Sequence, residues 1–323
     1  MPVRALPLRT VAPEAYARLV LPQSASLWAG KRDLKTYIGD NLEIANSRFG
    51  KRHYRTIGLF EGRTLVSSFK RYDRILEHAG WRLRGYGIGA VFTPPGFRGR
   101  GYATAMLASA LDSARAGGYD LAFLFSDVRP HFYSSIGFTE IPSREIVLRA
   151  DTLPTRRLAM RALVEADWKS VSRCFDMCGG GRTIFERTPL IWQWIRMRMR
   201  QRSEHPSGQP TNLFVRRRRG IGAYVLGARV PERDVYVVDE YGFADEEAAQ
   251  TVPALLRAAA GDLRRIAGWL PPAGARELIP KGSVRARRTA IFMIAALSPE
   301  GARLAAALTR KARFDYCWPT DHI

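Results

Sequence analysis

The fold is decided by residues 91–104, Val91-Phe92-Thr93-Pro94-Pro95-Gly96-Phe97-Arg98-Gly99-Arg100-Gly101-Tyr102-Ala103-Thr104. The pattern predicts the end of an apolar strand, a glycine-rich loop and the start of a helix. Such a helix start leaves backbone N–H groups without intrahelical partners, and the helix dipole adds partial positive charge there. Gly99 and Gly101 let the backbone approach a ligand closely, and Arg98 and Arg100 add cationic donors. We therefore predict an anion site suited to a pyrophosphate.

The segments around this loop alternate between strands and helices. Upstream we expect a hairpin from residues 57–60 and 64–69 with a turn at Gly62, and then a strand from 86 to 93. Glycines at 85, 87 and 89 predict a bulge or a close backbone approach in that region. Downstream we expect a helix over 102–116, a buried strand over 121–125, a short helix near 131–135 and a last strand over 145–148.

The pattern breaks between residues 149 and 157, where Asp151 and Pro154 interrupt it, so we expect domains at 1–150 and 155–323. In the second half we expect helices over 161–175, 190–199 and 253–267, and strands over 212–215, 222–228, 235–240 and 289–297. This order resembles that of the first half. It predicts a divergent second copy of the same domain.

The bulk composition is that of a globular protein of two domains, with 323 residues, 46% of them hydrophobic and 25% charged. No apolar run approaches the roughly 20 residues of a membrane helix, and no long apolar segment follows Met1, so we expect a cytoplasmic protein. The three cysteines cannot form a disulfide framework. Cys174 and Cys178 lack a nearby histidine, so we expect core thiols and no metal site.

The net charge of +21 would attract polyanions, including a phosphorylated cofactor. Most of this charge is arginine spread along the chain, and the one dense run, residues 216–219, lies between two expected strands. We interpret that run as a solvated hairpin turn. Because no zinc-finger spacing or RNP-type motif accompanies the charge, we do not expect nucleic acid to be the main partner.

The run Arg98-Gly99-Arg100-Gly101-Tyr102-Ala103 resembles the Arg-x-x-Gly-x-Gly/Ala signature of the GCN5-related N-acetyltransferases (GNATs). Phe132-Tyr133-Ser134-Ser135-Ile136-Gly137-Phe138 is similar to the family's second signature, and the resemblance covers roughly residues 55–150. It implies a GNAT fold, an α/β architecture with a mixed sheet, and acetyl-coenzyme A as co-substrate without a metal. The residues implied in binding it are Val91, Phe92, Thr93, Arg98, Gly99, Arg100, Gly101, Tyr102, Ala103, Thr104 and Ser126, although Ser126 could instead cap the next helix.

The resemblance also implies direct attack of an amine on the thioester, with Tyr133 as the general acid that protonates the leaving thiolate. Many relatives carry a glutamate base on the strand before the loop, but residues 81–91 contain no carboxylate. The remaining candidates are Asp73, Glu77, Asp127, His131, a water chain and the C-terminus. Acetyltransferases of the enhanced-intracellular-survival type bring their terminal carboxylate into the active site, so we hypothesise that the Ile323 carboxylate or His322 acts here.

The matching loop of the second half falls near residues 237–247, which hold five carboxylates and no Arg-x-x-Gly-x-Gly/Ala run. These charges would repel a pyrophosphate, so we expect a degenerate domain that shapes the acceptor site. Residues 124–127 before Phe132-Tyr133 are similar to fungal lysine N6-acetyltransferases, which favours a small amine or amino acid as acceptor. The alternatives are a protein-lysine or N-terminal acetyltransferase and, in another class, a basic nucleic-acid-associated protein on a lapsed GNAT fold. The oligomeric state stays open.

Overall fold

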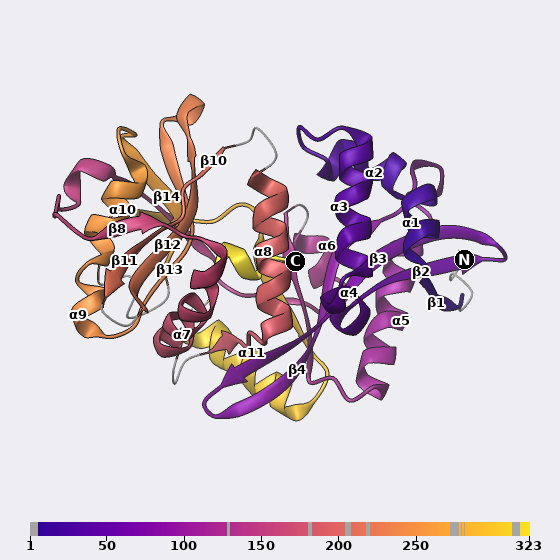
Figure 1. Ribbon diagram of the computed structural model, residues 1–323. Helices are drawn as coiled ribbons and strands as arrows, with labels where there is room; N and C mark the ends of the chain where they lie inside the picture. Colours follow the sequence, from indigo (N-terminus) through magenta and orange to yellow (C-terminus); the bar gives the residue numbers. More distant parts are fainter. Residues whose placement is uncertain are drawn as a thin grey trace.

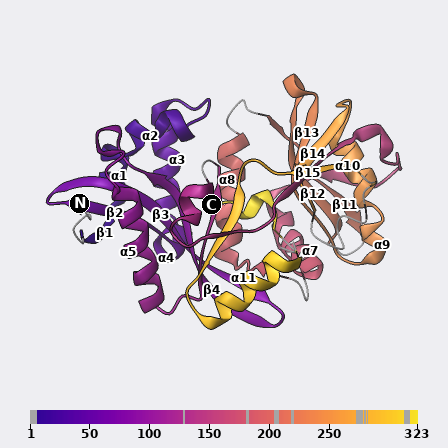
Figure 2. The same ribbon diagram turned by 180° about the vertical axis from the view of Figure 1, so that it is seen from behind.

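The structure of the protein, a computed structural model, describes residues 6–127, 130–179, 183–203, 208–217, 220–271, 278, 280, 282–311 and 317–323. Two β-sheets stand apart, and helix α8 (Pro189–Ser203) and the C-terminus lie between them in both views (Figures 1 and 2). In the described part of the chain, no helix is both long and apolar enough to span a membrane.

The first sheet has the strand order β1-β2-β3-β4-β5-β16-β6. Its strands are β1 (Leu8–Val11), β2 (Tyr54–Glu61), β3 (Thr64–His78), β4 (Trp81–Phe92), β5 (Leu121–Ser126), β16 (Ile291–Ala296) and β6 (Thr139–Glu140), and β9 (Ile184–Phe185) pairs with β3 beside this path. Neighbours are antiparallel except β4 and β5, which are parallel. The hairpin expected around Gly62 is confirmed as β2 and β3.

The second sheet repeats this plan in the order β8-β11-β12-β13-β14-β7-β15. Its strands are β8 (Met160–Ala162), β11 (Leu213–Arg217), β12 (Gly220–Val230), β13 (Val235–Phe243), β14 (Arg265–Trp269), β7 (Arg144–Arg149) and β15 (Ser283–Ala286), and β10 (Gln209–Pro210) pairs with β12. The parallel pair here is β13 with β14, at the same place in the order as β4 with β5. This correspondence supports the expected second copy.

The two halves of the sequence exchange one strand each. β16 comes from the second half but lies between β5 and β6, and β7 comes from the first half but lies between β14 and β15. The sequence locates both strands well, yet each was expected in the sheet of its own half. A continuous apolar run indicates a buried strand, but it does not show which strand will pair with it in the sheet. Because each exchange is a full backbone ladder, the halves cannot separate without breaking hydrogen bonds in both sheets.

The helices of the first half cover both faces of the first sheet. α5 (Tyr102–Ala116) follows the glycine-rich loop and packs Met106 and Leu107 against one face, together with Phe69 and Tyr86 of the sheet. α1 (Pro13–Leu19), α2 (Leu21–Trp28), α3 (Leu34–Asn46) and α4 (Arg48–His53) lie on the indigo side of Figure 1, and α6 (Pro130–Ser134) follows β5. The expected helix over 102–116 is confirmed with these bounds.

The helices of the second half depart from expectation at two ends. α7 (Trp168–Gly179) begins later than expected, because residues 160–162 pair with β11 as strand β8. α10 (Val252–Ala260) ends early, because Gly261 has a φ of +62° and residues 265–269 join the sheet as β14. α9 (Glu246–Ala249) and α11 (Pro299–Lys311) complete the set. The turn expected within the arginine run 216–219 includes residues 218–219, which lie outside the described residues.

Candidate active site

Strands β4 and β5 open away from each other beside the glycine-rich loop. They pair only over Gly85–Gly87 and Leu121–Phe123, although β4 continues to Phe92 and β5 to Ser126. On its other side β4 carries a bulge, because its register with β3 slips between the pairs Lys70–Gly89 and Ser68–Phe92, and Ala90 takes a φ of +46°. The predicted bulge is therefore confirmed, and the backbone of residues 88–92 lines one side of a wedge between the strands.

The loop that follows leaves the start of α5 without a side-chain cap. Gly101 is the N-cap residue, with a φ of +79°, and Gly99 has a φ of +75°, a conformation that glycine adopts without a Cβ penalty. Arg98 Nε donates to the Thr93 carbonyl at 3.0 Å and so closes the loop on the end of β4. Arg100 stands exposed, with its guanidinium 5.8 Å from the Phe97 ring centroid. The first amides of α5 therefore face the loop without a side-chain acceptor.

The other residues of the predicted cofactor segment differ in how deeply their side chains are buried. Phe92 is buried and meets Trp28 at a ring distance of 6.1 Å. Tyr102 is buried, and its hydroxyl donates to Glu61 at 3.1 Å. Val91, Thr93 and Ala103 are part-buried, whereas Thr104 is exposed. The side chains of Phe92 and Tyr102 thus serve packing, and only their backbone groups remain to contact a ligand.

The C-terminus of the chain enters the wedge from the face opposite α5. A Cβ on Gly87 would stand 2.7 Å from Ile323 Cδ1, and a Cβ on Gly89 would stand 3.2 Å from the Ile323 carbonyl carbon. A side chain at either position would crowd the terminal residue and require it to shift. The close backbone approach predicted from the glycines is therefore confirmed, and the approaching group is the end of the chain itself.

A buried network of charges fixes this terminal segment. Arg187 Nη2 lies 2.9 Å from Asp321 Oδ2, and its Nη1 lies 2.8 Å from Glu240 Oε2. Arg74 of β3 lies 3.3 Å from the same Asp321, and all four side chains are fully buried. Burial raises the pKa of Glu240, and the charge of Arg187 opposes that rise. The sequence gives no local signal for this network, because its members are separated by 50 to 250 positions.

His322 is held between aromatic rings and a cation. Its ring lies 5.1 Å from that of Phe125, and Arg198 of α8 donates to its backbone carbonyl. Burial, followed by the charges of Arg198, Arg287 and Arg202, lowers the pKa of His322 to about 3. A group with so low a pKa is a weak proton acceptor near neutral pH, which disfavours His322 as the general base.

Tyr133 lies on α6 in a small aromatic cluster, 5.1 Å from the ring of Phe132 and 6.1 Å from that of Phe138. Burial raises the pKa of Tyr133 to about 12, and the nearby charge of Asp127 adds to that rise. The phenol is therefore protonated at neutral pH. Ser126 is buried at the end of β5, where it is paired with Ile291 of β16.

The other candidate bases have structural roles or stand apart. Asp73 is paired with Arg71 at 2.9 Å and accepts from the Tyr119 hydroxyl at 2.8 Å. Glu77 faces Arg82 near the closed end of the β3–β4 hairpin. Asp127 accepts from the Ala290 amide at 3.0 Å, beside the start of β16. His131 is exposed on α6.

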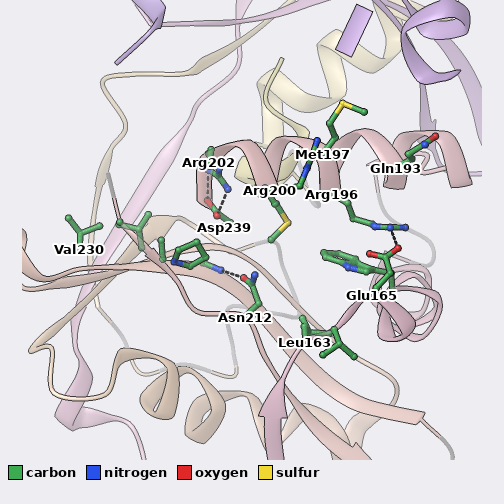
Figure 3. A pocket seen from close by; sticks show the side chains of 18 of the residues that line it. Leu163, Glu165, Gln193, Arg196, Met197, Arg200, Arg202, Asn212, Val230 and Asp239 are labelled. Carbon is green, nitrogen blue, oxygen red and sulfur yellow. Dashed lines mark hydrogen bonds and ion pairs between the residues drawn. The ribbon is translucent and has the colours of Figure 1, made fainter. Parts of the chain in front are cut away.

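A separate cavity of about 690 Å³ lies in the second half, between α8 and the second sheet (Figure 3). Arg202 and Asp239 form an ion pair across it at 2.5 Å, and Arg196 pairs with Glu165. The carboxylates of residues 237–247 are partly used in the fold, because Asp239 pairs with Arg202, Glu240 joins the buried network and Asp245 caps α9. The loop of the second half is thus built differently from residues 98–104.

Comparison with known proteins identifies a domain in the first half of the chain. Residues 33–141 match the model of an acetyltransferase (GNAT) domain. A search of curated proteins by sequence finds no match.

Three solved structures share the fold along most of the chain. A probable N-acyltransferase from Enterococcus faecalis, described as a conserved protein of unknown function, has a TM-score of 0.71 and 14% identity, over 91% of this chain and 73% of that one. A GCN5-related N-acetyltransferase from Anabaena variabilis has a TM-score of 0.71 and 14% identity, over 92% and 74%. A tandem GNAT protein from the clavulanic acid biosynthesis pathway has a TM-score of 0.52 and 12% identity, over 91% and 99%. Residues 33–141 thus match an acetyltransferase (GNAT) domain, and most of the chain shares its fold with solved GCN5-related N-acetyltransferases.

Proposed function

We propose that the protein transfers the acetyl group of acetyl-coenzyme A to the primary amine of a small molecule or amino acid, by direct attack of the amine on the thioester. The observation that carries this proposal is the wedge between β4 and β5, which has the open start of α5 at its mouth and Ile323 against Gly89 inside it. Donor and acceptor would meet where the strands part.

The donor would bind along the bulged end of β4 and the loop after it. Backbone groups of Val91, Phe92 and Thr93 would hold the pantetheine, as a strand would, and amides of residues 98–104 would hold the pyrophosphate. The positive end of α5 and the exposed Arg100 favour a polyanion at this place. The buried Ser126 ends the facing strand β5, where it would approach the pantetheine from the other side.

Two groups of this chain would serve the proton transfers of the reaction, one as general base and one as hydrogen-bond donor to the leaving group. The carboxylate of Ile323 would accept the proton of the attacking amine, because Ile323 lies at Gly89 in the wedge. Tyr133 would donate to the departing sulfur. Since the pKa of Tyr133 is about 12 and that of an ordinary thiol about 8.5, the phenol would stabilise the thiolate chiefly as a hydrogen-bond donor.

The two halves of the chain would have different roles in the reaction. Residues 1–150 would form the catalytic domain, and residues 155–323 would be a lapsed copy that shapes the acceptor side. The second half supplies the terminal residue at Gly89, together with α8 and most of the buried network that holds the terminal segment. Residues 237–247 lack the cationic, glycine-rich loop that residues 98–104 provide.

The proposal is tested by measuring thiol release from acetyl-coenzyme A in the presence of a panel of amines, together with calorimetric titration of acetyl-coenzyme A. Gly101→Glu should abolish both turnover and binding, because it places a side chain and a negative charge at the phosphate loop. Gly80→Glu is the matched control. Gly80 has a φ of +82° against +79° for Gly101, so the backbone strain and added charge are alike, but it lies in the β3–β4 turn.

Binding heat with the wild type and Gly80→Glu, and none with Gly101→Glu, is the expected result. If the wild type gave neither heat nor amine-dependent thiol release, the enzymatic proposal would fail. If acetyl-coenzyme A bound equally well to all three proteins, the cofactor site would lie elsewhere.

A further inference from the structure

Lys70 lies on β3 directly opposite Gly89, the residue that Ile323 approaches. Side chains alternate along a strand, so Lys70 faces away from α5 and toward the side that Tyr72 occupies, whereas Phe69 packs with α5. The ammonium group of Lys70 donates to Asn41 of α3 and lies 5.9 Å from the ring centroids of Tyr16 and Tyr54. Lys70 therefore projects beside the wedge, on the face that holds the chain terminus.

A second cation reaches the same region from α8. Arg198 donates to the backbone carbonyl of His322, and its guanidinium lies 4.7 Å from the ring centroid of Trp194. Trp194 in turn lies 5.9 Å from the ring of Tyr72, which follows Lys70 on the same face of β3. Helices α3 and α8 are in contact near this point, because Gln201 of α8 donates to Glu43 of α3 at 2.9 Å.

Neither cation forms an ion pair with any carboxylate among the described residues. Of the other cations nearby, Arg32 pairs with Asp40 at 2.9 Å, Arg74 and Arg187 pair with Asp321, and Arg287 donates to the Ala290 carbonyl. Removing Lys70 and Arg198 from water disfavours their charged forms, and the pKa values of both side chains are lowered. Burial, followed by the charges of Arg32 and Arg198, lowers the pKa of Lys70 to about 8, and burial lowers the pKa of Arg198 to about 10.

Uncompensated cations beside a reacting centre are costly to keep unless a ligand supplies the missing charge. Lys70 and Arg198 contribute two positive charges, and the carboxylate proposed at Ile323 contributes one negative charge, so at least one positive charge is left over in this region. A carboxylate on the acceptor would supply a missing negative charge.

We propose that the acceptor amine carries a carboxylate group, as an amino acid does, and that Lys70 and Arg198 bind that carboxylate while the amine faces the thioester. This inference rests on the proposed acetyl transfer and adds the chemical class of its acceptor. It assigns Lys70 and Arg198 to substrate binding rather than to proton transfer.

The test uses matched acceptors that differ only in charge: an amino acid and its carboxamide, for instance phenylalanine with phenylalaninamide and lysine with lysinamide, and 2-aminoethylphosphonate as the phosphonate-bearing probe. For the wild type, kcat/KM should favour the amino acid of at least one pair. Lys70→Met should raise the KM of that amino acid about tenfold or more, because a charge-assisted contact is lost, and should leave the carboxamide nearly unchanged.

Lys70→Arg keeps the charge and should restore most of the affinity, which guards against a merely structural loss. Above pH about 8 the KM of the wild type should rise relative to that of Lys70→Arg, because the ammonium loses its proton and a guanidinium does not. Lys35→Met, at an exposed position on α3, is the matched control and should behave as the wild type.

Equal effects of Lys70→Met on both members of each pair would overturn the inference, since Lys70 would then serve the chain's own terminus. A preference for the phosphonate or for the carboxamides would overturn it as well. If no amine is acetylated, the proposed transfer fails, and calorimetry of the same amino acids with wild type and Lys70→Met decides this inference separately: charge-dependent binding supports it, and no binding rejects it.

Discussion

Gly89 and Ile323 touch: a Cβ on Gly89 would stand 3.2 Å from the carbonyl carbon of Ile323 and equally close to the ring of Tyr72. Residues 234 positions apart in the sequence therefore share one small space. The absence of a side chain at position 89 and the placement of the chain terminus depend on each other, and this dependence can be tested from either side.

Gly89→Ala should displace the terminal residue by a few tenths of an ångström, because a contact of 3.2 Å is tighter than most Cβ contacts in packed proteins. Misplacing a reacting group by about 1 Å can cost about a hundredfold in rate. We expect kcat to fall by about ten- to a hundredfold while acetyl-coenzyme A binds as before, as measured by steady-state kinetics and calorimetry. Gly39→Ala on α3, where a Cβ meets nothing within 4 Å, should leave kcat unchanged.

Extending the chain by one glycine after Ile323 should test the proposed base directly. The anchoring contacts of Asp321 are kept, while the carboxylate moves by about 3.5 Å, the length of one extended residue. Because a general base typically contributes about a hundredfold or more, kcat should fall by at least that factor. An extended protein with undiminished kcat would show that another group takes the proton.

Tyr133→Phe should lower kcat with little effect on the binding of acetyl-coenzyme A, since it removes only the hydroxyl that we propose donates to the departing sulfur. The expected loss is about a hundredfold at neutral pH, where the phenol of the wild type is protonated. Tyr119→Phe removes a hydroxyl that donates to Asp73 instead, and serves as the control. Equal kcat values for the wild type and Tyr133→Phe would remove Tyr133 from the mechanism.

Arg187→Met should destabilise the protein strongly, because Asp321 and Glu240 would stay buried without their shared cation. Breaking a buried ion pair from one side typically costs about 3–5 kcal/mol of unfolding free energy. We expect this loss in urea titrations, together with a lower kcat from a loosened terminus. Arg82→Met breaks an exposed pair with Glu186 and should change the stability little. Similar stability losses in both variants would contradict the role assigned to the network.

His322 should make the protein sensitive to acid. Its pKa is about 3 in the folded chain and about 6.5 when unfolded, so below pH 6.5 the unfolded state takes up a proton that the folded state refuses. Its contribution to stability is complete above pH 6.5 and is lost as the pH falls toward 3. His322→Gln should flatten the dependence of unfolding free energy on pH in that window, whereas His131→Gln, at an exposed position, should not. Parallel curves for wild type and His322→Gln would contradict this assignment.

Much of the first half follows from local chemistry. The loop from Arg98 to Ala103, the helix after it and the glycines at 85, 87 and 89 are features of short segments, in which backbone conformation depends on neighbouring residues. They suffice to indicate an acetyltransferase (GNAT) domain and a close approach to β4, and they predict an anion site at the loop. The sequence does not identify the group that approaches these glycines, and only the structure shows that it is Ile323.

The other features of the fold and of the candidate site depend on contacts between residues far apart in the sequence. The sequence shows that residues 145–148 and 289–297 form strands, but only the assembled sheets show that β7 and β16 change places, because a ladder joins backbone groups that every residue carries. Long-range packing likewise determines the burial and the charged neighbours of four side chains, Arg187, Asp321, Lys70 and Arg198. In a chain of net charge +21, the sequence does not show which arginines and lysines are buried. Only the folded structure shows which of them have a counter-ion nearby.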